Sequence, residues 1–254
     1  MKLISLNAWG GRALEAFLEF IKENRDTDVF CFQEILHGNI DEKIWYGAKS
    51  NLFSMIKALL PEHVGFFASC EDRMDDRVAP RGLEIPFGLA MFVKKTIDMR
   101  EEGDLFVHGN RNALSNYDSA TQGRNIQYLK MAHNGKEFMV VNFHGLWNGK
   151  GKTDTPERLK QSQNIKKFVD DYPGDVILMG DFNLLPDAES LVMFEDRFTN
   201  LIKKYDIKST RTDLYPKEIK YADYIFISKG IKPLSLDVPN LPVSDHRPLI
   251  LEIS

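Results

Sequence analysis

The sequence predicts an α/β fold in which two β-sheets pack face to face and helices lie outside them. Short apolar runs rich in Val, Ile and Phe recur from one end of the chain to the other, bounded by Gly, Pro, Asn or Asp, as is typical of strands. Segments with helical spacing lie between these runs. The order strand, helix, strand, helix and then several strands occurs twice in loose form, which favours the layered arrangement.

The expected strands follow the apolar runs in order. They are residues 3–6, 29–32, 88–93, 126–131, 138–143, 176–179, 224–227 and 248–253. With 254 residues the chain could form one large domain or two small ones. Because the first and last runs are both strands and no linker-like composition lies between them, we expect a single domain over residues 1–254.

The expected helices rest on spacing and on end signals. Apolar residues within 14–21 recur at i, i+3, i+4 and i+7, which forms one apolar face. A longer helix is expected to begin at Pro156, with Thr155 as its N-cap, and to end at Pro173 and Gly174. Two shorter helices are expected over residues 52–60 and 188–194.

Composition and charge narrow the class of protein. The chain is 43% hydrophobic and 28% charged, which excludes disorder, collagen and coiled coil. A formal net charge of -4 does not support tight nonspecific binding to nucleic acid, which depends on a broad basic surface. A local basic patch could still hold a substrate beside an acidic metal site.

Cysteine usage and the chain start bear on location. Cys31 lies in an apolar run and Cys70 in a charged stretch, so we expect free thiols rather than a disulfide framework or a thiolate zinc site. The chain opens without signal-peptide features, and no apolar stretch is long enough to span a bilayer. We therefore expect a cytoplasmic protein with no integral membrane segment, and the sequence implies no protein partner.

Acidic and amide residues end several of the expected strands. Asp181 and Asn183 point to the same side of an extended chain, while Phe182 points back toward the core. Glu34 ends a buried strand, where a carboxylate is costly unless it meets a cation or hydrogen-bond donors. Taken alone, each residue has a plain structural interpretation as a turn former or a solvated strand end.

Convergence of these acids would create a metal site. If Glu34, Asp181, Asp223 and Asp245 meet, carboxylates about 4 Å apart repel by roughly 4 kcal/mol at an effective dielectric of about 20, so a divalent cation is the natural compensation. Oxygen ligands without a cluster of His or Cys favour Mg²⁺ or Mn²⁺ over zinc.

Adjacent residues Asp245 and His246 point to opposite sides of an extended segment, so they cannot form a Ser-His-Asp relay by themselves. Asp223 is the better candidate to orient His246.

In this order, these residues resemble the endonuclease/exonuclease/phosphatase superfamily, which includes deoxyribonuclease I, exonuclease III, the apurinic endonucleases, neutral sphingomyelinases and inositol polyphosphate phosphatases. The matching motifs are Leu3–Asn7, Gln33-Glu34, His144, Gly180–Asn183, Ala222–Tyr224 and Ser244–Leu249, and they span nearly the whole chain. The resemblance implies a deoxyribonuclease I-like, four-layer α/β/β/α sandwich of two mixed β-sheets flanked by helices, with the site at one end.

The resemblance also implies a role for each site residue. Glu34, helped by Asn7, would hold Mg²⁺ or Mn²⁺, and Asp245 would lie by that metal or a second metal position. Asp181 would orient and deprotonate the attacking water. The remaining implied roles are phosphoryl binding by Asn183, donation to the phosphoryl oxygens by His246 oriented by Asp223, and help to the leaving group from His144.

Three further residues are expected at the substrate. Arg124 would contact phosphate and Glu84 would orient His144 in the manner of deoxyribonuclease I, both through the resemblance. Trp147 could stack on a base or sugar, or could cover the core. The segments 69–86 and 145–155 are expected to be solvated connections, and the alternative is that they border the site and select the substrate.

The sequence thus predicts a divalent-metal-dependent hydrolase of phosphate esters, and it leaves open whether monoesters or diesters are cleaved. Trp9 stands where repair endonucleases usually carry Asp, which together with His144 argues against an apurinic endonuclease. The alternative is a nuclease acting on DNA or RNA. Basic residues that could follow a phosphate backbone are Lys203, Lys204, Lys208, Arg211, Lys217 and Lys220. A non-catalytic scaffold is a third hypothesis, disfavoured because no metal or His position is lost.

Overall fold

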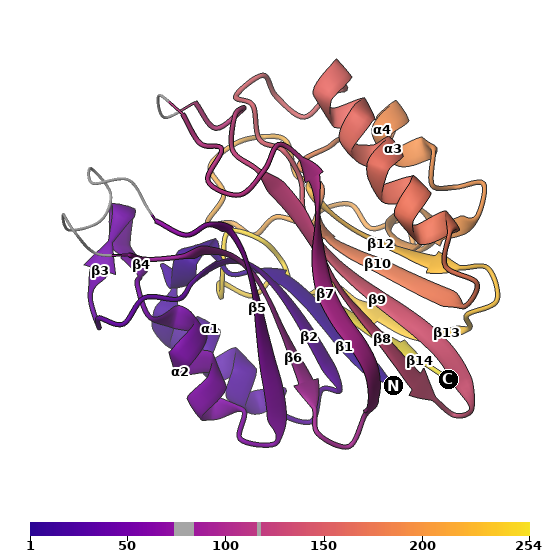
Figure 1. Cartoon of the computed structure of the whole chain (residues 1–254), viewed down its shortest axis with the longest axis horizontal. Helices are drawn as coiled ribbons and strands as arrows, with labels where there is room; N and C mark the ends of the chain where they lie inside the picture. The colour runs from indigo at the N-terminus through magenta and orange to yellow at the C-terminus, as the bar shows by residue number, and fades with distance from the viewer. Residues whose placement is uncertain (74–83, 116–117) are drawn as a thin grey trace.

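Two six-stranded β-sheets form the centre of the molecule and helices cover their outer faces (Figure 1). The structure, a computed structural model, describes residues 1–73, 84–115 and 118–254. It confirms the predicted four-layer sandwich. None of the helices in this described part of the chain has the length and apolar character needed to cross a bilayer.

Each sheet contains one parallel pair of strands among antiparallel neighbours, so both sheets are mixed. The first sheet has the order β13 (Pro233–Asp237), β14 (Leu249–Ile253), β1 (Lys2–Asn7), β2 (Val29–Leu36), β6 (Phe87–Lys94) and β5 (His63–Glu71). The second has the order β11 (Phe198–Asn200), β12 (Asp223–Ser228), β10 (Asp175–Asp181), β9 (Lys136–His144), β8 (Arg124–His133) and β7 (Asp98–His108). A small hairpin of β3 (Lys43–Ile44) and β4 (Ala48–Lys49) stands apart from both.

Helices α1 (Leu14–Glu23) and α2 (Leu52–Leu59) pack on the first sheet through an apolar cluster that contains Phe17, Phe32 and Ile56. Helix α3 (Pro156–Asp170) packs on the second sheet, with Ile165 and Val169 buried in the larger core. The remaining short helices are η1 (Trp9–Gly11), η2 (Trp45–Gly47), α4 (Glu189–Val192) and α5 (Leu201–Lys204). Thr155 caps α3 as predicted, because its side chain accepts a hydrogen bond from the Arg158 amide.

All the expected strands and helices are present, but β5, β7, β11, β13 and α5 were not predicted. Strand β7 is an exposed, highly charged edge strand, so it lacks the apolar run by which the other strands are recognised. Residues 69–71 belong to β5 and not to the expected loop 69–86, whose residues 74–83 lie outside the described residues.

Strand register brings polar residues to one end of each sheet. Asp181 of β10 lies opposite His144 of β9 on one side and opposite Asp223 of β12 on the other. A Cβ at Gly180 would collide with the Phe143 carbonyl oxygen, so this register requires glycine there. In the first sheet Asn7 lies opposite Gln33, next to a β-bulge between Phe32 and Ile35.

A buried polar bridge joins the two sheets just behind this end. The Gln33 side-chain amide donates to Asn142 Oδ1 at 2.7 Å. The Asn142 amide donates in turn to the backbone carbonyl of Phe32 at 3.0 Å. Because both side chains are fully buried, either one without its partner would keep an unsatisfied polar group in the core.

We therefore expect Asn142→Leu to lower the free energy of unfolding by about 1–3 kcal/mol, since the Gln33 amide loses its closest acceptor. The double variant Gln33→Leu with Asn142→Leu should lose clearly less than the sum of the two single changes. Urea denaturation followed by circular dichroism measures all three variants. Additive losses would contradict a direct coupling of these side chains.

Candidate functional site

A cavity of about 570 Å³ opens at the end of the sandwich where β1, β2, β9 and β10 finish. Most of the residues predicted for the site line it. These are Glu34, Arg124, His144, Trp147, Asp181, Asn183, Asp245 and His246. Asn7 and Asp223 lie immediately behind the wall, where they hydrogen-bond to lining residues. The predicted convergence of segments far apart in the sequence is therefore observed.

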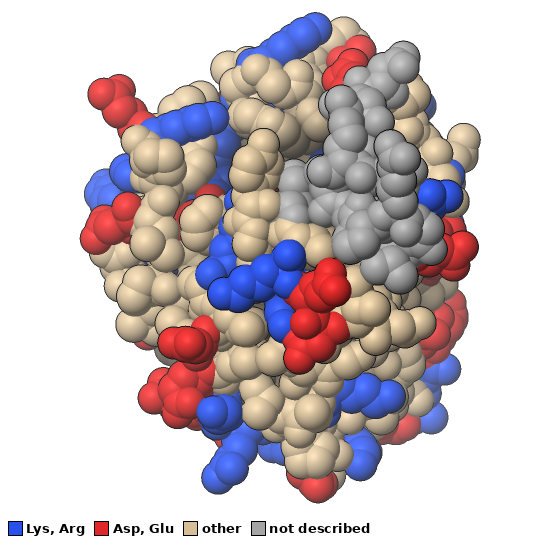
Figure 2. Space-filling model, turned by 90° about the vertical axis from the view of Figure 1, so that its left-hand side faces the viewer, with Lys and Arg blue, Asp and Glu red and all other residues tan. Residues whose placement is uncertain are grey.

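Charge on the neighbouring surface is mixed. Figure 2 faces the side of the molecule that carries the β3–β4 hairpin, and it shows Lys and Arg side chains near the middle of this face with Asp and Glu beside them. No single-sign field dominates the described part of this view. A long nucleic-acid backbone would need a broader basic surface.

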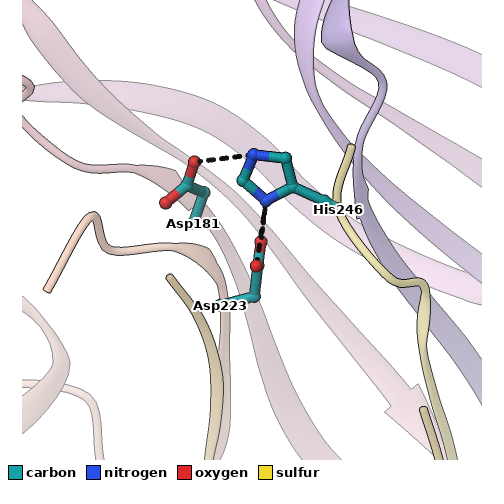
Figure 3. Close-up of side chains that lie close together, drawn as sticks. All are labelled: Asp181, Asp223 and His246. Carbon is teal, nitrogen blue, oxygen red and sulfur yellow. Dashed lines mark hydrogen bonds and ion pairs between the residues drawn. The ribbon is translucent and has the colours of Figure 1, made fainter. Parts of the chain in front are cut away.

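His246 lies between two buried carboxylates (Figure 3). Its Nδ1 donates to Asp223 at 2.9 Å, and its Nε2 lies 3.5 Å from Asp181 Oδ2. Burial and Arg211 act to lower the pKa of His246, but the charges of Asp223, Asp245 and Asp181 outweigh them and raise it. The imidazole is thereby held in a form that can donate from both nitrogens.

Asp181 is the central acceptor of the site. Its Oδ1 accepts from the Asn183 backbone N–H at 2.8 Å, and its Oδ2 accepts from Asn7 Nδ2 at 3.1 Å. Burial by itself would raise the pKa of Asp181, but the imidazoles of His246 and His144 and the nearby cations hold it below its usual value. Asp181 is therefore ionised at neutral pH although it is almost fully buried.

Asn7 connects the acids of the two sheets. Its amide nitrogen donates to Glu34 Oε1 at 3.0 Å as well as to Asp181, while its Oδ1 accepts from the Trp9 backbone N–H at 2.9 Å. In this arrangement the amide N–H groups, and not the carbonyl oxygen, face the carboxylates. Asn7 thus positions Glu34, and its role as a metal ligand stays a prediction.

Glu34 sits in the β2 bulge with a positive φ of 55°, a conformation that non-glycine residues rarely adopt. Burial and the charge of Asp245 raise the pKa of Glu34, so the folded protein disfavours the ionised form of this carboxyl group. The imidazole of His144 lies beside it, with Nε2 3.9 Å from Oε1, but this ring is neutral and does not balance the charge of the carboxylate. A hard divalent cation would supply the missing positive charge, so the donor set fits Mg²⁺ or Mn²⁺.

His144 is neutral in this setting. Burial and the charge of Arg124 lower its pKa to about 3. Arg124 Nη1 lies 3.5 Å from His144 Nδ1, which leaves Nε2 to carry the proton and to face Asp181 and Glu34. Glu84, expected to orient His144, is exposed instead, and Arg124 occupies the place beside Nδ1.

Two cations of the site were not predicted as site residues, since Lys152 was not named from the sequence and Arg211 was named only for the nuclease alternative. Arg211 Nη1 donates to Asp245 Oδ2 at 2.6 Å and so neutralises that carboxylate. Lys152, from the expected loop 145–155, is buried in the cavity wall. Trp147 of the same loop is half-buried in the wall, with Lys217 Nζ 5.5 Å from the centre of its ring.

Among the described residues, Asp181, Asp223 and His246 form a group whose ligand atoms lie within 4.8 Å of one another and which could hold a metal ion. However, His246 already donates to Asp223 through Nδ1, and its Nε2 faces Asp181. The imidazole is therefore better placed as a hydrogen-bond donor than as a ligand. Glu34, whose pKa is raised by burial and by the charge of Asp245, is the better anchor for a cation.

Several solved structures share this fold over the whole length of this chain. One is a mannosyl-6-phosphatase of Bacteroides thetaiotaomicron, with 18% identity, a TM-score of 0.71, and coverage of 100% of this chain and 99% of that chain. A Leptotrichia buccalis protein of the endonuclease/exonuclease/phosphatase family gives 16% identity, a TM-score of 0.72, and coverage of 100% and 99%. The human Nocturnin catalytic domain gives 20% identity, a TM-score of 0.68, and coverage of 100% and 93%.

Comparison of the sequence with curated proteins gives no match. The model of the endonuclease/exonuclease/phosphatase family matches residues 4–246, which contain the whole set of acid, amide and imidazole groups described above. The chain therefore belongs to the endonuclease/exonuclease/phosphatase family.

Proposed function

We propose that this protein is a divalent-metal-dependent hydrolase of phosphate esters that acts on small molecules. The proposal rests on the buried contacts of His246 with Asp223 on one side and Asp181 on the other. These residues lie at a cavity that also contains Glu34, a carboxylic acid with a raised pKa. Groups with strongly shifted pKa values that gather at a cavity are typical of catalytic sites.

Glu34 would hold Mg²⁺ or Mn²⁺, with Asp245 beside it, and the ion would supply positive charge for the leaving oxygen. Asp181, ionised because of its cationic neighbours, would orient the attacking water through its carboxylate. Asn183 would hold the phosphoryl group. His246, kept protonated by the acids around it, would donate to the phosphoryl oxygens as negative charge builds up.

His144 would act on the leaving-group side. Its low pKa keeps it neutral, so we expect it to stabilise the leaving oxygen by a hydrogen bond from Nε2 rather than to deliver a proton as an imidazolium. Arg124 fixes this tautomer from the other ring nitrogen and, as a buried lining residue, remains available to a phosphate.

The size of the cavity supports a small substrate. A volume of about 570 Å³ is within the range of small-molecule sites. One of the similar structures is a mannosyl-6-phosphatase, and an ester of that class would fit such a cavity.

The nuclease alternative loses support because three of its six proposed basic residues are paired with acids. Lys203 pairs with Glu195, Lys208 pairs with Asp206, and Arg211 pairs with Asp245. Degradation of plasmid or oligonucleotide with steep salt sensitivity would favour the nuclease.

Hydrolysis of bis(p-nitrophenyl) phosphate tests the site. We expect turnover with Mg²⁺ or Mn²⁺ and none in EDTA. Asp181→Asn and His246→Ala should each lower kcat/KM by about 10²–10⁴-fold, because each removes an oriented proton acceptor or donor. Asp171→Asn, which removes an exposed ion pair with Lys167, is the matched control and should be unchanged. Metal-independent turnover, or full activity in the two site variants, would refute the proposal.

Thermal unfolding tests the metal anchor without an activity assay. In EDTA, Glu34→Gln should have a melting temperature equal to or above that of the wild type, because a raised carboxyl pKa means that the fold disfavours the ionised form. A divalent ion at about 100 times its Kd should stabilise the wild type by about 2.7 kcal/mol and leave the variant unaffected. Equal metal-induced shifts in both proteins would show that Glu34 is not the anchor.

A further inference from the structure

We propose that Lys152 and Arg211 form an anion subsite that recognises the second negative charge of a phosphomonoester, so that this protein prefers phosphomonoesters to phosphodiesters. The inference rests on the proposed function and narrows its substrate class. It concerns two cations to which no role in the chemistry has been given above.

Lys152 is a buried cation with few partners. Its side chain lines the cavity although the residue is only 2% exposed. An ammonium group has three donors, and within the described ranges Nζ makes one hydrogen bond, to the Tyr221 carbonyl oxygen at 2.6 Å. The described acids include none within ion-pair distance of Nζ. A lysine buried for structural reasons alone would be expected to have a carboxylate partner.

Arg211 lies beside the same aromatic ring as Lys152. Its guanidinium carbon lies 4.2 Å from the centre of the Tyr215 ring, and Lys152 Nζ lies 5.5 Å from the same centre. Arg211 uses Nη1 to hold Asp245, while its Nη2 makes no hydrogen bond with the described residues. Two positive side chains therefore share one tyrosine inside the cavity, with donors to spare.

The electrostatics of this pair favour a bound anion. Burial and the positive charge of Arg211 lower the pKa of Lys152 to about 8, against the pull of Asp181, Asp223 and Asp245. Lys152 is thus mostly charged at neutral pH, and none of the described carboxylates lies within ion-pair distance to balance this charge. An anion between the two cations would relieve their repulsion and engage their free N–H groups.

The two classes of phosphate ester differ in the number of negative charges that they carry. A phosphodiester carries one negative charge, and the proposed contacts from His246, Asn183 and His144 already serve a phosphoryl group of that charge. A phosphomonoester has a second pKa of about 6 and so carries close to two negative charges at neutral pH. Lys152, which has no carboxylate at ion-pair distance among the described residues, matches that additional charge.

The test compares the two ester classes in one variant. Lys152→Met keeps the length and apolar stem of the side chain but removes the charge. With p-nitrophenyl phosphate, we expect kcat/KM to fall by about 10–100-fold, the loss of a charge-assisted hydrogen bond of about 1.5–3 kcal/mol. With bis(p-nitrophenyl) phosphate the fall should stay below about 3-fold. Lys167→Met, an exposed lysine of α3, is the matched control and should change neither rate.

Anion binding without turnover provides a second measurement. In EDTA, inorganic phosphate should raise the melting temperature of the wild type and not that of Lys152→Met. Without phosphate, the variant should melt no lower than the wild type, because it no longer buries an underpartnered charge. A lowered melting temperature with equal losses on both esters would show a structural role and overturn the inference.

The two proposals fail in different ways. A wild type that hydrolyses neither ester with any divalent ion would defeat the hydrolase proposal, whereas phosphate stabilisation lost in Lys152→Met would still support the subsite. A wild type active on both esters, with an unchanged ratio in Lys152→Met, would defeat the subsite alone.

Discussion

The register of three neighbouring strands is the constraint on which the site depends. Because β9, β10 and β12 are aligned so that His144, Asp181 and Asp223 occupy one row, three polar groups reach the same level at the end of one sheet. A slip of one residue would turn each of these side chains to the opposite face. Gly180 protects the alignment, since any side chain there would push β10 away from β9.

The second constraint is the contact between the sheets. Asn7 belongs to the first sheet and Asp181 to the second, so their hydrogen bond requires correct packing of the two layers. The Gln33–Asn142 bridge fixes that packing a short distance behind the cavity. Glu34 and Asn183 both hold positive φ values of 55°, conformations that a well-determined framework can maintain at a functional site.

Sequence patterns predicted much of this arrangement, for definable reasons. Strands buried on both faces carry continuous apolar runs, and the acids that end them, Glu34 and Asp181, stand out by contrast. The roles of Lys152 and Arg211 could not be predicted, because a lysine among glycines and an arginine in a basic segment have the composition of solvated loops. Lys152 contacts Tyr215 and Tyr221, which are distant from it in sequence, and Arg211 contacts Tyr215 of its own segment. Glu84, by contrast, is close in sequence to a core strand, but its side chain is exposed and does not line the cavity.

The exposed charged residues of strand β7 affect how this protein can associate with other molecules. It lies at one margin of the second sheet, and no strand of residues 1–73, 84–115 or 118–254 pairs with its outer side. Glu101, Glu102 and Asp104 are exposed along it. A strand from another molecule that docked there would have to bring its own side chains against this row of negative charge. Growth of the sheet by addition of further molecules, the first step toward fibrils, is thereby discouraged at this margin.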